Sequence, residues 1–216
     1  MADGADDLRG FQHPRFARMY ERMSVESDER GGTEHRVRLL EGLSGRVIEV
    51  GAGNGRNFVH YPAAVEELVA VEPEDRLRAA AERAAGEARV KVDVVAGHAD
   101  AIPAPDGSFD AAVVSLVLCS VPDPHHTLAE IRRVLRVGGE LRFYEHVRAR
   151  HRVRGTVDDL ITPLWSRLGA GCHPNRRTAE DIAAAGFEIV ELDRFPFRAS
   201  RFIPPTAHIL GRARRS

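Results

Sequence analysis

The sequence predicts an α/β fold in which a largely parallel sheet is covered by helices. From Val47 onward, short β-branched runs alternate with alanine-rich or mixed helical stretches, a pattern typical of parallel strands joined by helical crossovers. The first run leads straight into a glycine-rich stretch, VIEVGAGNGRNF. With 216 residues, 43% of them hydrophobic, the chain can bury one good core. We therefore expect one main domain, over residues 44–216.

The segment before that domain is expected to be a flap. Residues 1–10 have the composition of a flexible lead, and residues 11–43 that of one or two amphipathic helices interrupted by Gly31 and Gly32. This segment is too short for a core of its own, so residues 1–43 are assigned as a lead and a helical flap.

The middle of the chain supplies five strand runs and two clear helices. The runs are RVIEV, ELVAV, VKVDVVA, FDAAVVSLV and ELRFYEHV. Helical stretches follow the second and fourth runs, as EDRLRAAAERAA and DPHHTLAEIRRVLR. The latter is expected to end at Gly138 and Gly139, since glycine commonly ends a helix.

The last third of the chain is less regular. Residues 148–177 are too long for an ordinary connection, so we expect a functional covering segment or a helical insertion there. Thr178 and Asp181 resemble a capping box that opens the helix TAEDIAAAGF, with Gly186 after its end. Two strand-like pieces follow, FEIVELDRF and residues 206–211.

Composition limits the classes of function. The formal net charge is −1, from 31 basic and 32 acidic residues, which argues against a nucleic-acid partner. No apolar run approaches the length of a membrane span, and the first residues are acidic where a signal peptide would be basic. Two cysteines without a CxxC spacing, and the pair His125 and His126 without a third ligand nearby, give no metal motif. We expect a soluble, cytoplasmic protein without a metal, and the sequence indicates no oligomeric state.

The glycine stretch predicts a ligand site. A strand, bare backbone and a helix start place free N–H groups beside a ligand. A dinucleotide fingerprint would need its third glycine at position 56, where this chain has Arg56; the glycine comes one residue earlier, at Gly55. Glu49 precedes the loop. A carboxylate there disfavours a pyrophosphate and favours a cationic ligand.

The second strand run indicates a nucleoside. It ends at Glu72, 21 residues after Gly51 (72 − 51), where a carboxylate can accept hydrogen bonds from the two hydroxyls of a ribose. Enzymes that use NAD have the same device, so an NAD-dependent dehydrogenase is an alternative. Arg56 and Glu49 count against it.

Four motifs in order resemble the class I S-adenosylmethionine-dependent methyltransferases: VIEVGAGNG, VEPE, GHADAIPAPDGSFD and VLRVGGELRFYEH. The resemblance covers about residues 47–147 and, more weakly, the rest of the chain. It implies a Rossmann-like sheet of seven strands, mostly parallel with an antiparallel last strand, and helices on both faces. It also implies S-adenosyl-L-methionine as the methyl donor and S-adenosyl-L-homocysteine as the product.

Further stretches, LVLCSVPDP, LRFYEHV, TPLW and GAGCHPNRRT, look like the methyltransferase-like seven group of alkyl-thiol methyltransferases and their bacterial relatives. This resemblance implies methyl transfer to a small lipophilic acceptor, foremost a thiol or an amine. A phospholipid or quinone-type lipid acceptor is an alternative. A non-enzymatic alternative is a regulatory module that binds S-adenosylmethionine and transfers nothing.

The resemblance also implies cofactor contacts. The three loop glycines would approach the methionine part and the ribose, Glu72 would bind the ribose hydroxyls, and Glu49 would lie near the sulfonium or the α-amino group. The acidic residue that many relatives place at the adenine is His98 here. The expected cofactor-binding residues are Glu49, Gly51, Gly53, Asn54, Gly55, Asn57, Phe58, Glu72, Pro73, His98, Ala99, Leu116 and Cys119.

The acceptor site is expected beyond the fifth strand run. His146 ends that run, and a neutral imidazole could take a proton from the acceptor, so it is the candidate catalytic residue. A histidine bonded to a loop carbonyl is an equal alternative. Glu145 should point to the opposite face. Trp165, Cys172 and Arg176, in residues 148–177, are the candidate substrate-binding residues.

Overall fold

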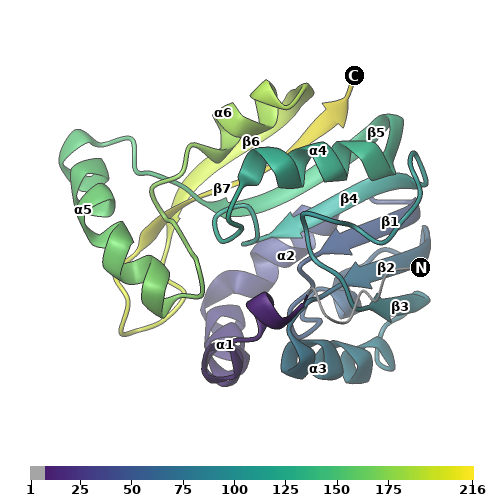
Figure 1. The fold of residues 1–216 in the computed structure, drawn as a ribbon, viewed down its shortest axis with the longest axis horizontal. Helices are drawn as coiled ribbons and strands as arrows, with labels where there is room; N and C mark the ends of the chain where they lie inside the picture. Colours follow the sequence, from purple (N-terminus) through teal and green to yellow (C-terminus); the bar gives the residue numbers. More distant parts are fainter. Residues whose placement is uncertain (1–7) are drawn as a thin grey trace.

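A seven-stranded sheet confirms the expected fold (Figure 1). The computed structural model describes residues 8–216. The strands stand in the order β3-β2-β1-β4-β5-β7-β6, and β7 runs antiparallel to both of its neighbours while the other pairs are parallel. Their bounds are β1 Gly45–Val50, β2 Val65–Val71, β3 Val92–Val95, β4 Phe109–Ser115, β5 Leu135–His146, β6 Phe187–Phe197 and β7 Thr206–Arg215.

Helices cover both faces of the sheet. They are α1 Pro14–Ser27, α2 Thr33–Leu40, α3 Asp75–Ala85, α4 Pro124–Val134, α5 Arg152–Leu168 and α6 Thr178–Ala184. Short turns of other helix types lie at Arg9–Phe11, Asp28–Gly32 and Phe58–His60. Helices α4 and α6 lie on one face, α2 and α3 on the other, and α5 stands away from both layers (Figure 1).

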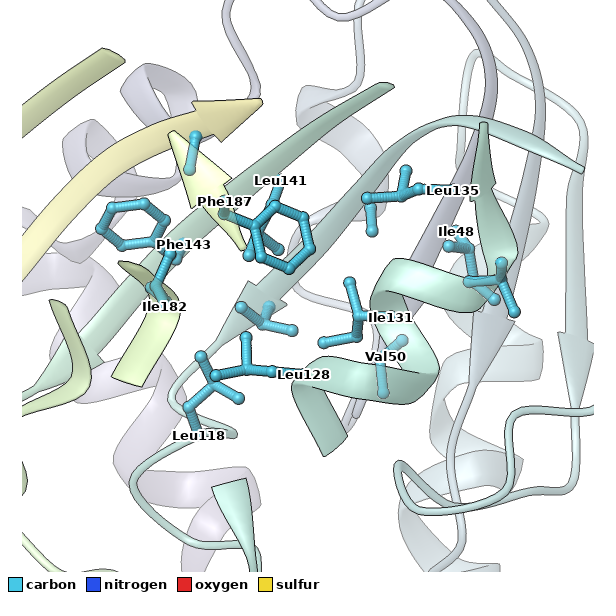
Figure 2. Close-up of a cluster of buried hydrophobic side chains, with 14 of the residues drawn as sticks. Ile48, Val50, Leu118, Leu128, Ile131, Leu135, Leu141, Phe143, Ile182 and Phe187 are labelled. Atoms are coloured by element: carbon cyan, nitrogen blue, oxygen red, sulfur yellow. The ribbon is translucent and has the colours of Figure 1, made fainter. Parts of the chain in front are cut away.

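Side chains of alternate direction on each strand supply the two halves of the core. Ile48 and Val50 of β1 point toward α4 and α6, whereas Val47 points toward α2. Figure 2 shows the first cluster, in which Leu128 and Ile131 of α4 pack over the strands. Burial of these apolar surfaces holds the strand ends in fixed positions.

Local signals explain where α3 and α4 begin. The carboxylate of Asp123 accepts hydrogen bonds from the first N–H groups of α4, and Pro124 occupies the first helical position. Glu74 caps α3 in the same way, through the N–H of Leu77 at 2.8 Å. The interruption expected in the flap lies at Gly31, whose φ is +108°.

Two boundary predictions are wrong. Helix α4 ends at Val134 and β5 starts at once, so Gly138 lies inside the strand with a φ of +77°. The capping box is absent, because Thr178 is already helical and its hydroxyl has no hydrogen-bond partner among the described residues. Of the expected lead, residues 1–7 lie outside the described residues, Leu8 is buried, and Arg9 and Gly10 belong to the helical turn Arg9–Phe11.

Candidate active site

The carboxyl ends of β1, β2, β4 and β5 meet at one edge of the sheet, and the loops that leave them form the candidate site. The loop after β1 contains the three glycines. The loop after β2 contains Glu72, the loop after β4 contains Leu116 and Cys119, and β5 ends at His146. The order of the strands thus brings together residues that lie up to 97 positions apart (146 − 49).

Gly53 and Gly55 leave room for side chains of different segments. A Cβ at Gly53 would lie 3.1 Å from the ring of Tyr20, so this backbone faces the flap. A Cβ at Gly55 would lie 2.8 Å from the ring of Phe58 and 2.9 Å from Ala84, so this backbone faces the core. Phe58 is fully buried there. Its ring packs α3 against the loop, which argues against the expected contact with a cofactor.

Glu72 braces the loop at the tip of β2. Its carboxylate accepts hydrogen bonds from the N–H of Gly53 at 2.7 Å and of Glu74 at 2.9 Å. The side chain is buried, and this desolvation raises the pKa of Glu72 to about 7 despite the two donors. Further hydrogen bonds from hydroxyl groups would stabilise the charged form of this buried carboxylate.

Glu49 lies below the loop in a buried polar network. It accepts hydrogen bonds from the amide of Asn57 at 2.6 Å and the hydroxyl of Tyr61 at 2.9 Å. Burial raises the pKa of Glu49 to about 7. The amide oxygen of Asn57 accepts from Arg36, which also pairs with Asp28 at 2.8 Å. The loop thus has a polar floor in which Asn57 supports Glu49.

The flap lies over the loops after β1 and β2. Its Gln12 donates to the carbonyl of Pro73 at 2.8 Å, and the ring of Phe11 stacks on His98 with centroids 4.8 Å apart. Ser24 on α1 accepts from Asn54 at 3.0 Å. The sequence did not predict Tyr20 and Gln12 at this site, although the amphipathic pattern of the flap indicated the helix that bears Tyr20.

The loop after β4 is held by Glu145. Its carboxylate accepts from three successive N–H groups, those of Val117, Leu118 and Cys119, each at 3.0 Å. The loop starts at Leu116, whose φ of +62° is rare for a leucine and is sustained by the surrounding contacts. Glu145 is buried, and it accepts from the N–H of Cys119, whereas His146 contacts the Sγ of the same residue.

Two cysteines and a histidine meet at the end of β5. The Nδ1 atom of His146 lies 3.5 Å from the Sγ of Cys119 and 3.6 Å from the Sγ of Cys172. The two sulfurs are 3.9 Å apart, and both cysteines are buried. This contact was not predicted from the sequence, because 53 residues separate the cysteines (172 − 119) and only the tertiary fold brings them together.

Aromatic side chains surround this end of β5. His208 of β7 pairs with His146 in the sheet, with ring centroids 4.4 Å apart, and stacks on Tyr144. Burial holds the pKa of His208 well below its usual range, so the ring is neutral and its Nδ1–H donates to the carbonyl of Thr206 at 3.0 Å. The rings of Phe195 and Phe197 and that of His35 complete the group.

Arg176 and Trp165 lie in the segment that also bears Cys172, whereas Ala99 follows β3. The guanidinium of Arg176 donates to the carbonyls of Leu118 and Val121, so it clamps the loop after β4. Trp165 lies half-buried near the end of α5, beside Gly169. Ala99 is half-buried and packs against the core.

Comparison with known proteins assigns the family. A model of the methyltransferase domain matches residues 48–143. The thiol S-methyltransferase TMT1B of Homo sapiens is 34% identical over 183 residues, which cover 82% of this chain and 74% of the human protein. The chain belongs to the S-adenosylmethionine-dependent methyltransferases. As such it is an enzyme that uses S-adenosylmethionine as methyl donor.

One more sequence relative and one solved structure are also similar to this methyltransferase. A demethylmenaquinone methyltransferase of Thermobifida fusca is 36% identical over 115 residues, 52% of this chain and 49% of that protein. The crystal structure of a SAM-dependent methyltransferase from Thermotoga maritima superposes with a TM-score of 0.69 at 25% identity, covering 94% of this chain and 97% of the other. Among residues 8–216, no helix has the length and apolar character of a membrane span.

The site fits the methyl donor. Gly53 leaves space between the loop and Tyr20 that a side chain would fill, and Glu72 presents a buried carboxylate at the tip of the neighbouring strand. Glu49 is a second buried carboxylate, and its burial raises its pKa despite the hydrogen bonds from Tyr61 and Asn57. A ligand with ribose hydroxyls, an ammonium and a sulfonium supplies what both carboxylates lack.

Proposed function

We propose that this methyltransferase transfers the methyl group of S-adenosylmethionine to the sulfur of a small lipophilic thiol. The observation that supports this most is the aromatic group around His146, at the same sheet edge as the cofactor loops. The human relative acts on thiols, and the similarity spans most of both chains. An apolar, ring-lined acceptor site suits a lipophilic thiol better than a charged metabolite.

For the donor, Glu72 would accept hydrogen bonds from both ribose hydroxyls while it keeps the N–H of Gly53. Glu49 would face the ammonium or the sulfonium, directly or through water. The adenine would lie by His98 and Ala99, next to the ring of Phe11. Gly51 and Asn54, in the loop after β1, would line one side of the methionine part. Leu116, at the start of the loop after β4, would line the other side.

The reaction needs alignment more than acid–base chemistry. The thiol sulfur attacks the methyl carbon, the carbon–sulfonium bond breaks with its electron pair going to the leaving sulfur, and the thiol proton leaves to a base or to water. Positioning of this kind supplies effective molarities on the order of 10⁵ M or more. His146 lies at the acceptor side and would receive the proton. This role assumes that no metal ion is bound to the imidazole.

Two segments would enclose the reactants. The flap, residues 8–43, already contacts the loops after β1 and β2 and would close over the donor. The segment 148–177 contributes Cys172 and Trp165 to the acceptor side and would cover the acceptor. Enclosure excludes water from a reactive sulfonium. We place this small-molecule reaction in the cytoplasm, as the sequence suggests.

A quinone-type acceptor is the second candidate, because the Thermobifida fusca relative is a demethylmenaquinone methyltransferase. That similarity covers 52% of this chain and 49% of the relative, whereas the similarity to the human thiol methyltransferase covers 82% and 74%. We therefore rank it below the thiol.

The test is a panel assay with S-adenosylmethionine as donor. An alkyl thiol, a primary amine, phosphatidylethanolamine and a demethylated quinone are offered separately, and methylated products are measured by mass spectrometry. The proposal predicts turnover of the thiol at least about tenfold above the others, as expected for a difference of about 1.4 kcal/mol in transition-state binding. Donor binding without turnover of any acceptor would favour a regulatory module instead.

A further inference from the structure

The cluster of Cys119, His146 and Cys172 has a geometry that a hydrogen-bonded group does not explain. Both sulfurs approach the same nitrogen, at 3.5 and 3.6 Å, and they lie 3.9 Å from each other. A single Nδ1 atom can accept one proton or donate one, and thiols are weak donors. Each thiol has one proton to donate, so hydrogen bonds account for at most two of the three contacts.

The same distances match a tetrahedral metal centre. With Zn–S bonds of about 2.3 Å and a Zn–N bond of about 2.0 Å, tetrahedral angles place two sulfurs about 3.8 Å apart and each sulfur about 3.5 Å from the nitrogen. The observed spacings are 3.9, 3.5 and 3.6 Å. All three ligand atoms lie within 4.8 Å of one another, close enough for one ion to contact them all.

We propose that Cys119, Cys172 and His146 bind a Zn²⁺ ion, and that the fourth position of this ion receives the thiolate of the acceptor. Within residues 8–216, no further His, Cys, Asp or Glu joins these three ligands. Three protein ligands with one open position are the arrangement of catalytic zinc sites, whereas structural sites use four. The occupant of the fourth position rests on the proposed thiol acceptor, whereas the three protein ligands do not.

The chemistry of the ligands selects the metal. Thiolate and imidazole favour Zn²⁺ over Mg²⁺ or Ca²⁺, which prefer oxygen. Two thiolates also neutralise the charge of the ion, so the burial of Cys119 and Cys172 is compatible with a dication. This replaces the sequence-based expectation of no metal, which rested on the absence of a local CxxC motif.

Hydrogen bonds hold the loop that bears one of the proposed ligands. Cys119 belongs to the loop that Glu145 holds by three hydrogen bonds, and the same loop is clamped by Arg176. Its Val117 touches the glycine loop, since a Cβ at Gly51 would come within 2.6 Å of that side chain. The loop that bears the proposed metal ligand Cys119 therefore contacts the loop of the proposed donor site.

The proposed step balances without a protein base. The acceptor thiol loses its proton to solvent as its sulfur binds Zn²⁺, because the metal lowers the pKa of the bound group. The bound thiolate attacks the methyl carbon, and the carbon–sulfonium bond breaks toward the donor sulfur. The products are a thioether, a weak ligand that dissociates, and S-adenosylhomocysteine. In the zinc form, His146 is a ligand and does not act as a base.

The experiment measures metal content first and activity second. The protein is purified without metal-affinity resin, desalted, and analysed by inductively coupled plasma mass spectrometry. We expect about one zinc per chain in the parent protein and less than about one tenth of that in Cys119→Ser, Cys172→Ser and His146→Gln, since each removes one of three ligands. His125→Gln is the matched control, because its ring is exposed on α4, and it should keep the zinc.

A second readout guards against misfolding. Binding of S-adenosylhomocysteine should persist in the ligand variants, and cobalt in place of zinc should give a thiolate charge-transfer band in the parent protein only. Chelation should lower thiol methylation about tenfold or more, with recovery on adding Zn²⁺. Zinc far below one per chain, a zinc content that the variants do not change, or a Cys119–Cys172 disulfide in the purified protein would overturn the proposal. Zinc without thiol methylation would overturn only the proposed acceptor, and thiol methylation without zinc only the metal.

Discussion

The N–H of Gly53 donates to the carboxylate of Glu72 across the ends of two adjacent strands, at 2.7 Å. This bond fixes the bare glycine backbone beside the carboxylate that we propose to bind the ribose. It links the two halves of the proposed donor site.

Replacing Glu72 should weaken donor binding. In Glu72→Gln, the charge-assisted hydrogen bonds to the ribose hydroxyls are lost, and at about 1.5 to 3 kcal/mol for a bond to a charged group the dissociation constant of S-adenosylhomocysteine should rise about 10- to 100-fold. Isothermal titration calorimetry measures it. Glu66→Gln, at an exposed acid on the same strand, is the control and should bind as the parent does. Equal affinities for the two variants would remove Glu72 from the site.

Donor binding should strengthen as the pH rises from 6 to 8. Burial raises the pKa of Glu49 and of Glu72 to about 7, so both are partly protonated near neutrality without ligand. Ribose hydroxyls and an ammonium favour the charged carboxylates, so binding should release protons, and titrations in buffers of different ionisation heat detect this. In the free protein the same groups favour stability below a pH of about 4.5, and this contribution fades as pH passes about 7. An affinity that stays constant between pH 6 and 8 would contradict the assignment.

The flap should contribute to donor binding through Tyr20. Its ring faces Gly53 at 3.1 Å from the position of a Cβ. Tyr20→Ala removes an aromatic contact and should raise the KM for S-adenosylmethionine about tenfold. Tyr20→Phe preserves the ring and should bind nearly as the parent does. A KM for Tyr20→Ala equal to that of the parent would show that the flap does not close over the donor.

Loss of Glu145 should destabilise the fold. In Glu145→Ala, three buried N–H groups lose their acceptor, and at about 1 to 3 kcal/mol for each unsatisfied group the free energy of unfolding should fall by about 3 kcal/mol or more. Urea denaturation measures it, and Glu188→Ala, at an exposed position of β6, is the control. A change below about 1 kcal/mol would mean that solvent replaces the lost acceptor.

The apolar cluster in Figure 2 predicts a cavity effect. Leu128 is fully buried between α4 and the sheet, so Leu128→Ala should lower the free energy of unfolding by about 2 to 5 kcal/mol. Val137→Ala, at a residue that is 75% exposed, should change it by less than about 0.5 kcal/mol. Similar values for the two variants would argue against this packing.

The sequence predicted the parts of the site that lie in one local motif. The strand, the glycine spacing and Glu72 are read from neighbouring residues, and the structure places them together because parallel strands end at one edge. It did not predict the contact of Cys119 with Cys172, nor that of Tyr20 with Gly53, since these depend on how distant segments pack. The end of α4 was misplaced for a related reason: sheet pairing of Leu135 with Phe109 overrides the helical pattern of the sequence.

One assay tests the central claim most directly. The purified protein is incubated with methyl-labelled S-adenosylmethionine and a simple alkyl thiol, and mass spectrometry follows the labelled thioether and S-adenosylhomocysteine. The proposal predicts equal amounts of the two products, with formation that depends on the enzyme and falls in Glu72→Gln. Absence of labelled thioether, under conditions where the protein binds S-adenosylhomocysteine, would contradict it.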